Sequence, residues 1–285
     1  MNLLYITFGK DPSIHLQALY SMASFLKKPS YIKRIIVITD EPELYTVIRE
    51  HINLQFLSEK TFNEWKGPHN FFWRIKIKGI EWAMTKFSGE PILYADTDTF
   101  LSHSAHEIAL ALQENSAFMH ENEGPLALKK SKTEKKMWRQ VIGQQFGGRT
   151  IKNCDAMWNA GFIAFPNTTN GQEIQLALNI CDEMCAKKVI TRLIEQFSLS
   201  LALAHFYPIK EAKQMIVHYW SAKSIWNKAL MQIFSSYTLK NYKDETVLEK
   251  LCQLPLNHLP TVMNEKNTAR RLKNLIDKIF PSKTS

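Results

Sequence analysis

Short apolar runs alternate with longer stretches of helical periodicity along the first half of the chain. The runs at residues 3–8, 34–39 and 92–95 are short and bounded by turn residues, which is typical of buried strands. A further short strand is expected at 53–57. Apolar residues recur at helical spacing in the intervening segments, at 13–26, 42–51 and 71–87. This order predicts an α/β fold with a mainly parallel sheet covered by helices on both faces.

The second half of the chain is richer in helical patterns. Strands are predicted at 116–120, 161–165 and 215–219, and helices at 171–187 and 192–205. The basic stretch 128–149 indicates a helix followed by a mobile loop that ends in two glycines. From about residue 221 the pattern is helical and increasingly basic. We therefore predict one α/β domain over 1–225 and a helical, basic C-terminal extension over 226–285.

Composition narrows the class of partner rather than the fold. The chain has 285 residues, of which 45% are hydrophobic and 11% aromatic, as expected for a globular protein with a substantial core. Its formal net charge of +9 favours anionic partners such as nucleotides, phosphorylated substrates or an acidic membrane surface. Nucleic acid is disfavoured, because the basic residues are spread along the chain and form no nucleic-acid motif.

Cysteine spacing and the termini predict a cytoplasmic protein. None of the four cysteines has the two-residue spacing of a zinc or redox motif, so reduced thiols are expected. The N-terminus lacks the basic region of a signal peptide, and no apolar stretch is long enough for a membrane span. The segment 269–280 is amphipathic and basic. It could make a peripheral membrane contact or form a helix packed on the domain. The packed helix is favoured, because most amphipathic helices face the core of their domain.

The strand predicted at 92–95 is followed by Asp96 and Asp98. In open α/β sheets, ligands bind at the carboxyl ends of the strands. Two carboxylates this close repel each other, and a divalent cation with a preference for oxygen ligands is the usual compensation. A pair of solvated turn aspartates is the alternative. The well-bounded apolar strand favours a Mg²⁺ or Mn²⁺ site.

Two groups of basic and imidazole side chains could serve such a site. Arg74 and Lys78 are one helical turn apart, so they could hold phosphate oxygens, although an ordinary solvated helix face has the same pattern. His218 follows an apolar pair near a predicted strand end, and Lys223 lies five residues beyond it. A neutral imidazole can complete a carboxylate metal site, although a lone histidine among aromatics is more often a packed core residue.

Further polar groups lie near the later strands and helices. The run Asn159-Ala160-Gly161 is read as the entry to a strand, where small residues let a ligand approach the backbone. A turn before a strand explains the same residues. Glu195 and Gln196 begin an otherwise apolar helix and could either complement its dipole or bind a sugar hydroxyl.

Taken in chain order, these elements resemble the GT-A-fold nucleotide-sugar transferases, especially bacterial relatives of the glycogenin and lipopolysaccharide glycosyltransferase type. The resemblance covers roughly the first 225 residues. It depends on the order of the first strand, the Arg74/Lys78 helix, Asp96-Thr97-Asp98, Asn159-Ala160-Gly161, Glu195-Gln196, and His218 with Lys223. The chain departs from the glycogenin-like pattern in its late motif, where Ser221-Ala222 replaces the usual glycine, and at Glu195-Gln196.

The resemblance implies a Rossmann-like GT-A fold and transfer of a sugar from a nucleoside diphosphate sugar, such as a UDP-sugar. Mn²⁺ or Mg²⁺ would be held by Asp96, Asp98 and His218. The acceptor would be a glycan, a lipid-linked molecule or a protein. The nucleoside would lie near Thr7, Phe8 and Asp40, and Arg74, Lys78 and Lys223 would neutralise the phosphate oxygens. Asn159, Asp155 and Glu195 are candidates for sugar or acceptor contacts. The other residues expected to bind the donor are Thr97, Ala160, Gly161 and Gln196. Glu195 and Asp155 are the catalytic candidates beside the two aspartates, and either one acting as a general base would allow inversion.

Two other functions share part of this pattern. Haloacid-dehalogenase-type phosphatases also place Asp-x-Asp after an apolar strand, with the first aspartate as nucleophile. That family prefers threonine or valine where this chain has Phe100, and its later Gly-Asp metal pair is missing. The remaining alternative is a non-catalytic protein that binds nucleotide sugars without turnover.

Overall fold

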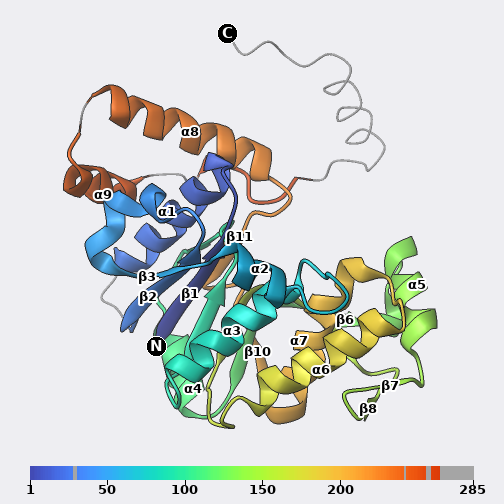
Figure 1. Cartoon of the computed structure of the whole chain (residues 1–285). Helices are drawn as coiled ribbons and strands as arrows, with labels where there is room; N and C mark the ends of the chain where they lie inside the picture. Colours follow the sequence, from blue (N-terminus) through green and yellow to red (C-terminus); the bar gives the residue numbers. More distant parts are fainter. Residues whose placement is uncertain (28–30, 241, 255–257, 264–285) are drawn as a thin grey trace, which may run out of the picture.

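The centre of the protein is a seven-stranded sheet. The computed structural model describes residues 1–27, 31–240, 242–254 and 258–263 (Figure 1). The strand order is β10–β6–β9–β4–β1–β2–β3. β1 pairs in parallel with β2 and β4, whereas β9 runs antiparallel to β4 and β6. The predicted α/β class with a mainly parallel sheet is therefore confirmed. The strands are β1 (Asn2–Thr7), β2 (Arg34–Thr39), β3 (Ile52–Phe56), β4 (Ile92–Ala95), β6 (Ala117–Pro125), β9 (Ala156–Phe165) and β10 (Ile209–Glu211).

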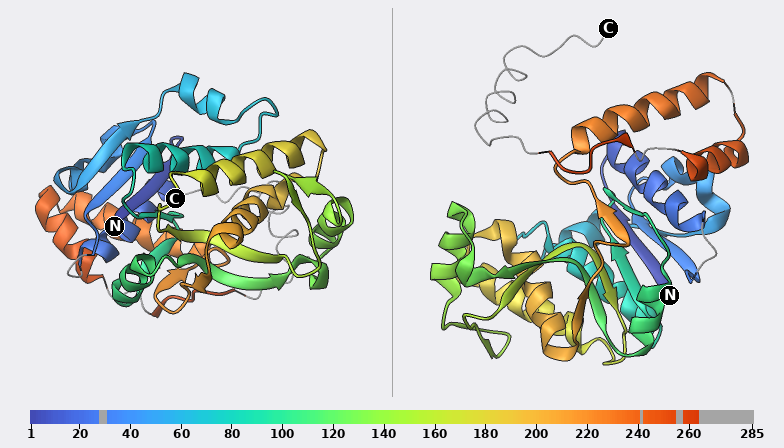
Figure 2. Two further views of the ribbon diagram at one scale, coloured as in Figure 1. Left: turned by 90° about the horizontal axis from the view of Figure 1, so that it is seen from below. Right: turned by 180° about the vertical axis from the view of Figure 1, so that it is seen from behind.

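Helices cover both faces of the sheet (Figure 1). One core lies between the sheet and the helices α3 (Arg74–Lys86), α6 (Gln172–Ala186) and α7 (Ile194–Phe206). The opposite core is closed by α1 (Pro12–Leu26) and α4 (His106–Gln113). The C-terminal helices α8 (Lys223–Leu239) and α9 (Asp244–Gln253) lie outside α1 (Figure 2). Each helical layer buries one apolar face against the sheet, and the sheet is buried on both of its faces.

Smaller elements complete the chain. Two of them form a separate antiparallel pair, β5 (Thr99–Leu101) with β11 (Ile216–His218), which crosses the carboxyl end of β4. The others are η1 (Pro42–His51), α2 (Glu59–Trp65), η2 (Leu126–Leu128), α5 (Lys132–Val141), β7 (Gln145–Phe146), β8 (Arg149–Thr150) and η3 (Thr191–Leu193).

Local sequence explains where several elements begin. All four residues of β4 are buried, as expected of a continuous apolar run in a central strand. The helix α1 begins at Pro12, a favoured first helical residue, and the Asp11 carboxylate accepts the Ser13 N–H. Ser131 and Glu134 form a reciprocal capping box at the start of α5.

Some boundaries differ from the sequence-based predictions. The segment 42–51 is a 3₁₀ helix interrupted at Tyr45, and the helix predicted from residue 71 begins at Arg74. The predicted strand at 116–120 continues to Pro125. Asn159, Ala160 and Gly161 lie inside β9 rather than at its entry. Alternating side chains of a strand therefore reach the site, rather than residues at the entry to that strand.

Predictions for the C-terminal region remain largely open. The predicted helical character after residue 221 is present as α8 and α9, and the proposed boundary at 225/226 falls inside α8. The segment 269–280 lies outside the described residues. Within the described residues, no helix is both long and apolar enough to cross a membrane.

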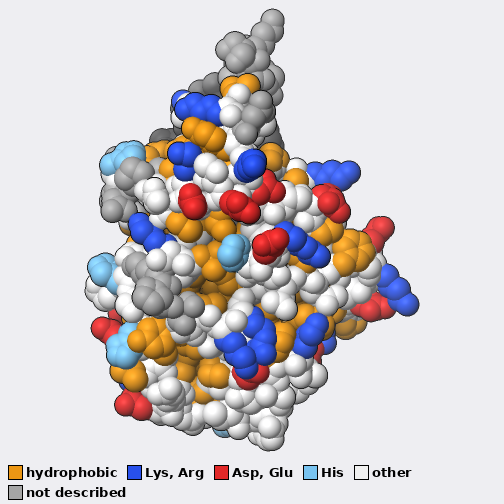
Figure 3. All heavy atoms as spheres, turned by 90° about the vertical axis from the view of Figure 1, so that its left-hand side faces the viewer, with side chains coloured by type: hydrophobic (Ala, Val, Ile, Leu, Met, Phe, Trp, Pro, Cys, Tyr) orange, Lys and Arg blue, Asp and Glu red, His pale blue; other side chains and the backbone are white. Residues whose placement is uncertain are grey.

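On the face shown in Figure 3, basic and acidic side chains are interspersed rather than gathered by sign.

Candidate functional site

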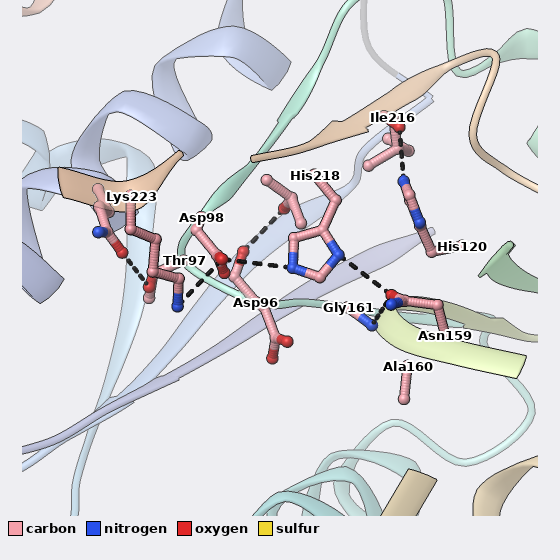
Figure 4. A network of polar contacts seen from close by, with 12 residues as sticks. Asp96, Thr97, Asp98, His120, Asn159, Ala160, Gly161, Ile216, His218 and Lys223 are labelled. Carbon is pink, nitrogen blue, oxygen red and sulfur yellow. Dashed lines mark hydrogen bonds and ion pairs between the residues drawn. The ribbon is translucent and has the colours of Figure 1, made fainter. Parts of the chain in front are cut away.

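Asp96, Asp98 and His218 meet at the carboxyl end of β4 (Figure 4). Strand β4 ends at Ala95, and the next N–H, that of Asp96, donates to Gly161 O of β9 at 2.8 Å. The chain then turns into β5, which β11 pairs in antiparallel register so that His218 lies opposite Thr99. One ligand atom from each of the three side chains lies within 4.8 Å of the others.

Asp98 is the buried member of the group, with its side chain only 2% exposed. Its Oδ2 lies 3.3 Å from His218 Nε2 and 3.0 Å from Lys223 Nζ. Burial alone would raise the pKa of Asp98, but the hydrogen bond and charge of His218 and the charge of Lys223 lower it below its ordinary value. Tyr219 stacks on Trp226 at 4.2 Å between the centroids, which helps to fix the turn from β11 into α8 and hence Lys223.

The orientation of His218 follows from its other ring nitrogen. Asn159 Oδ1 accepts the Gly161 N–H at 3.0 Å and lies 3.1 Å from His218 Nδ1. Because this amide oxygen can only accept, Nδ1 must carry a proton and donate to it. The ring lies directly against Gly161, in the space that a Cβ at this position would occupy. Glycine is therefore required here for a close approach between side chain and backbone.

This arrangement is complementary to a cation. With Nδ1 protonated, the Nε2 of a neutral imidazole points its lone pair at the Asp98 carboxylate, which is unfavourable unless a proton or metal ion lies between them. The oxygen and nitrogen ligands also suit Mn²⁺ or Mg²⁺. An ion about 2.1 Å from each ligand separates its ligand atoms by roughly 3 to 4.2 Å, so small side-chain movements would close the cluster. Asp96, Asp98 and His218 thus fit a divalent metal site.

Asp96 is joined to a second, deeper group by Lys76. The Lys76 ammonium lies 3.2 Å from Asp96 Oδ1, 3.0 Å from Glu195 Oε1 and 3.2 Å from Ala160 O. Burial acts to lower the pKa of Lys76, but the charges of Asp96 and Glu195 outweigh it and raise that pKa. Burial raises the pKa of Glu195, with Lys76 opposing and Asp96 adding. Asp96 Oδ1 also accepts the Tyr94 hydroxyl at 2.7 Å.

Sequence reasoning overlooked Lys76, although its helical phase was informative. Residues 3, 4 and 7 positions further on, Gly79, Ile80 and Ala83, are all buried. Residues at this spacing share one face of a helix, so Lys76 belongs to the core-facing stripe of α3. A lysine on an apolar stripe needs a carboxylate partner, and that requirement was the available signal.

Arg74 and Lys78 lie on the opposite, polar side of α3. Arg74 makes two hydrogen bonds with Asp182 of α6, at 2.7 and 2.9 Å, and a third with Trp65 O. Lys78 pairs with Glu81 one turn further along the same helix. A phosphate-binding role for Arg74 or Lys78 stays a prediction, and it would require these ion pairs to open.

Thr97 and Phe8 are each held by neighbours from other elements. The Thr97 hydroxyl donates to Gln17 Oε1 of α1 at 2.9 Å. Phe8 follows β1 and meets Phe62 and Phe72 edge-to-face, at 5.4 and 5.1 Å between the centroids. These contacts tie the turn between β4 and β5, and the end of β1, to the helices around the site.

The end of β1 forms a hydrogen-bonded loop at the predicted nucleoside edge. His15 contacts Gly9 O at 2.7 Å and the Tyr45 hydroxyl at 3.0 Å, and Tyr45 in turn contacts Thr7 Oγ1 at 2.8 Å. Gly9 has a φ of +80°, and its N–H is shared by both carboxylate oxygens of Asp40. Asp40 therefore shapes this loop, and nucleoside contacts by Thr7 and Asp40 stay predictions.

Two residues of the bulged strand β6 support the histidine and were not predicted. Glu123 Oε1 accepts Asn159 Nδ2 at 3.3 Å, which orients the amide that holds His218. His120 packs edge-to-face on His218 at 5.1 Å, and its Nε2 lies 3.1 Å from Ile216 O. Burial, together with the charge of His218, lowers the pKa of His120 to about 4. The register shifts of β6 bring both side chains to this place.

Asp155 and Gln196 lie in local networks of their own. The Asp155 carboxylate accepts Arg149 Nη2 at 2.6 Å and the Lys152 N–H at 2.7 Å, so both of its oxygens hold the loop before β9. A general-base role for Asp155 stays a prediction that would require this loop to rearrange. Gln196 is half-buried in the first turn of α7, beside Glu195.

The structure thus gathers one part of the predicted site and leaves another part apart from it. The gathered residues are connected by hydrogen bonds and ion pairs from α3 to α8, and the fold adds Lys76, Glu123 and His120 to them. They are Asp96, Asp98, Asn159, Ala160, Gly161, Glu195, His218 and Lys223.

Comparison with known proteins adds a likeness of fold. No family model matches the sequence, and no curated protein matches it. Among solved structures, the chain is similar to the galactosyltransferase LgtC in complex with donor and acceptor sugar analogues, at 12% identity over 74% of each chain and a TM-score of 0.47. It is similar to apo mouse xyloside xylosyltransferase 1 at 12% identity, over 74% of this chain and 85% of that one, with a TM-score of 0.48. The bifunctional glycosyltransferase WbbM matches at 12% identity, over 74% of this chain and 38% of its own, with a TM-score of 0.42. All are glycosyltransferases, but at TM-scores this low the function has to be judged from the chemistry of the site.

Proposed function

We propose that this protein is a metal-dependent glycosyltransferase that moves a sugar from a nucleoside diphosphate sugar, such as a UDP-sugar, to an acceptor. The observation that carries the proposal is the convergence of Asp96, Asp98 and the oriented Nε2 of His218 at the carboxyl edge of the sheet. That edge is where α/β proteins bind nucleotides, and the ligand set suits a cation that holds a diphosphate.

Each charged group has a distinct role in this proposal. Asp96, Asp98 and His218 hold the ion, and Mn²⁺ or Mg²⁺ there would act as a Lewis acid on the diphosphate leaving group. Lys223 lies 3.0 Å from Asp98, and its side chain is 48% exposed, so it can turn from the carboxylate to a phosphate oxygen. Asn159 and Glu123 keep the His218 tautomer that leaves Nε2 free to bind the ion.

The deeper group would face the sugar. The Lys76 ammonium bridges the carboxylates of Asp96 and Glu195 by an ion pair with each of them. Such a buried ion pair keeps a carboxylate in a fixed place without solvent. We propose that Glu195 and Lys76 bind sugar hydroxyls, with Gln196 and the backbone of Ala160 and Gly161 beside them. Binding groups that are already positioned reduce the entropy cost of aligning the sugar for transfer.

A phosphatase of the haloacid-dehalogenase type is not favoured. Its first aspartate would have to attack phosphorus, whereas Asp96 is bonded to the Tyr94 hydroxyl and the Lys76 ammonium. Hydrolysis of an aryl phosphate by the wild-type protein, lost in Asp96→Asn, would instead support the phosphatase.

The test of the proposal is a thermal-shift screen of nucleoside diphosphates and nucleotide sugars, with and without Mn²⁺. A ligand that binds only the folded state raises the melting temperature. At one hundred times its Kd, such a ligand adds about 2.7 kcal/mol to the free energy of unfolding. We expect a shift with at least one nucleoside diphosphate that depends on Mn²⁺ and is lost in Asp98→Asn. Release of free sugar from the matching nucleotide sugar then distinguishes an enzyme from a non-catalytic binding protein.

A further inference from the structure

The helix α5 carries a concentrated basic surface on the outside of the molecule. Between residues 129 and 142 there are six lysines and arginines and one glutamate. Lys129 is neutralised by Glu123 and Glu134, at 3.3 and 3.6 Å. The five others are exposed, and none of them has an ion-pair partner among the described residues. They form what we call the α5 basic surface: Lys130, Lys132, Lys135, Lys136 and Arg139.

The four helical members of this surface point in one direction. At 3.6 residues per turn, Lys132, Lys135, Lys136 and Arg139 span an arc of only about 100° on the helix. The buried residues of α5, Met137 and Val141, lie on the other side, against the domain. Figures 1 and 2 show α5 at the outer edge of the molecule, and no described helix or strand lies over its outer side.

Gathering these charges has a cost within the folded chain. The arrangement contains four like-charge pairs at the i,i+3 and i,i+4 spacings, and each such pair destabilises a helix slightly. A solvated helix face normally mixes the two signs, as the face in Figure 3 does. A single-sign, unpaired face therefore indicates an anionic partner rather than a solubilising role.

Exposed apolar residues flank the same helix. Leu128, just before it, is 74% exposed, and Ile142, just after it, is 39% exposed. Cations that are accompanied by exposed aliphatic side chains match a membrane interface, where lysines bind lipid headgroups and leucine enters the acyl boundary. A soluble polyanion or nucleic acid would use the cations but would gain nothing from Leu128.

We propose that the α5 basic surface, with Leu128 and Ile142, binds the surface of an anionic phospholipid membrane. Through Lys129 and Glu123, the same segment is connected to Asn159, which holds His218. These contacts link the segment that carries the basic surface to the candidate site. The proposal does not depend on the proposed function, because it rests on charge and exposure alone.

The test is flotation or sedimentation of the full-length protein with vesicles of phosphatidylcholine, with and without about 30% phosphatidylglycerol. We expect binding only to the anionic vesicles. The triple variant Lys132→Gln, Lys135→Gln, Lys136→Gln should bind them about 100-fold more weakly, because each cation near the surface contributes about 1 kcal/mol and 1.4 kcal/mol is tenfold. Its urea midpoint should be unchanged or higher, because like-charge pairs are removed.

A matched control makes the same change in net charge elsewhere. Lys228, Lys240 and Lys243 are exposed and lie on or between α8 and α9. Their triple change to glutamine should weaken vesicle binding by no more than a few-fold. Equal losses in the two triple variants would show that net charge alone drives binding, and they would overturn the proposal.

The variant Leu128→Ser separates a membrane from a soluble polyanion. We expect about tenfold weaker binding to anionic vesicles and unchanged binding to a heparin oligosaccharide. If Leu128→Ser leaves vesicle binding unchanged, or if heparin binds as tightly as the vesicles, the surface is one for soluble polyanions and the membrane proposal fails. Wild-type protein that ignores anionic vesicles at physiological salt would also refute it.

Discussion

Lys76 offers the sharpest test of how the site is held together. Its ammonium lies 3.2 Å from Asp96 and 3.0 Å from Glu195, and its side chain is only 9% exposed. In Lys76→Met the lysine stem is replaced by an apolar side chain of similar length, while the two carboxylates lose their shared cation. Removing one partner of a buried ion pair typically costs about 3 to 5 kcal/mol, because the remaining charge stays buried without compensation.

The size of this loss should depend on pH. Burial already raises the pKa of Glu195 against the opposing charge of Lys76, and that pKa rises further when the lysine is removed. A carboxyl group whose folded pKa is raised contributes stability below its unfolded pKa of about 4.3, and this stability is lost as the pH rises through the folded pKa. The defect of Lys76→Met should therefore be largest near pH 8 and should shrink toward pH 5, by up to about 1.4 kcal/mol per pH unit.

Urea unfolding at pH 8, 6.5 and 5 measures both effects. The matched control is Lys78→Met on the same helix, where the partner is Glu81 on a partly exposed surface and the expected loss is below about 1 kcal/mol. Adding Glu195→Gln to Lys76→Met should restore part of the stability, because a neutral amide replaces the uncompensated carboxylate. Equal, pH-independent losses in the two lysine variants would refute a buried Asp96–Lys76–Glu195 group.

Three further predictions concern the histidines and their supports. Gly161→Ala places a methyl group where the His218 ring lies, so Mn²⁺ affinity measured by electron paramagnetic resonance should fall about 10- to 100-fold. When Gly161→Ala is added to His218→Ala, the affinity should change little, because the displaced ring is already absent. Asn159→Ala should lower Mn²⁺ affinity by a similar factor and shift the ¹⁵N signals of His218 away from the Nδ1–H tautomer. Glu123→Gln keeps an acceptor for Asn159 and should lower Mn²⁺ affinity a few-fold at most. Equal effects of the two changes would contradict the role of Asn159 in orienting His218. His120 has a pKa lowered to about 4 from about 6.5, so its contribution to stability is present above pH 6.5 and is lost as the pH falls, by at most about 3 kcal/mol. His120→Leu should flatten urea stability between pH 7 and pH 4.5, and an unchanged slope would exclude this histidine as its source.

Local patterns in the sequence predicted the framework of the sheet. The strands at 34–39 and 92–95 were placed to the residue, because continuous apolar runs bounded by turn residues allow little else. The short helix α2 was missed, since its seven residues are too few to show a period. The interruption of η1 at Tyr45 was also missed, because that residue turns inward to bond His15 and Thr7, which no local pattern reveals.

The site was predicted where strand ends reveal chemistry and missed where packing decides it. The cluster of Asp96, Asp98 and His218 was expected, and the structure brings these residues together. Lys76 was passed over because Arg74 and Lys78 share a helical face and were taken together as phosphate ligands, whereas Lys76 lies on the buried face of α3. Glu123 reaches Asn159 only through bulges in β6, which depend on how strands pair across the sheet.

In the proposed function, Asp96, Asp98 and His218 bind a divalent ion that holds a nucleoside diphosphate. The decisive measurement is calorimetric titration of the nucleoside diphosphate with the largest thermal shift, UDP being the first candidate, into the wild-type protein with and without Mn²⁺, with Asp98→Asn measured in parallel. We predict binding of that nucleoside diphosphate that is strong with Mn²⁺, at least tenfold weaker without it, and weak in Asp98→Asn whether or not Mn²⁺ is present. Binding of equal strength in all four titrations, or no binding of any nucleoside diphosphate to the wild-type protein with Mn²⁺, would contradict the proposed metal site.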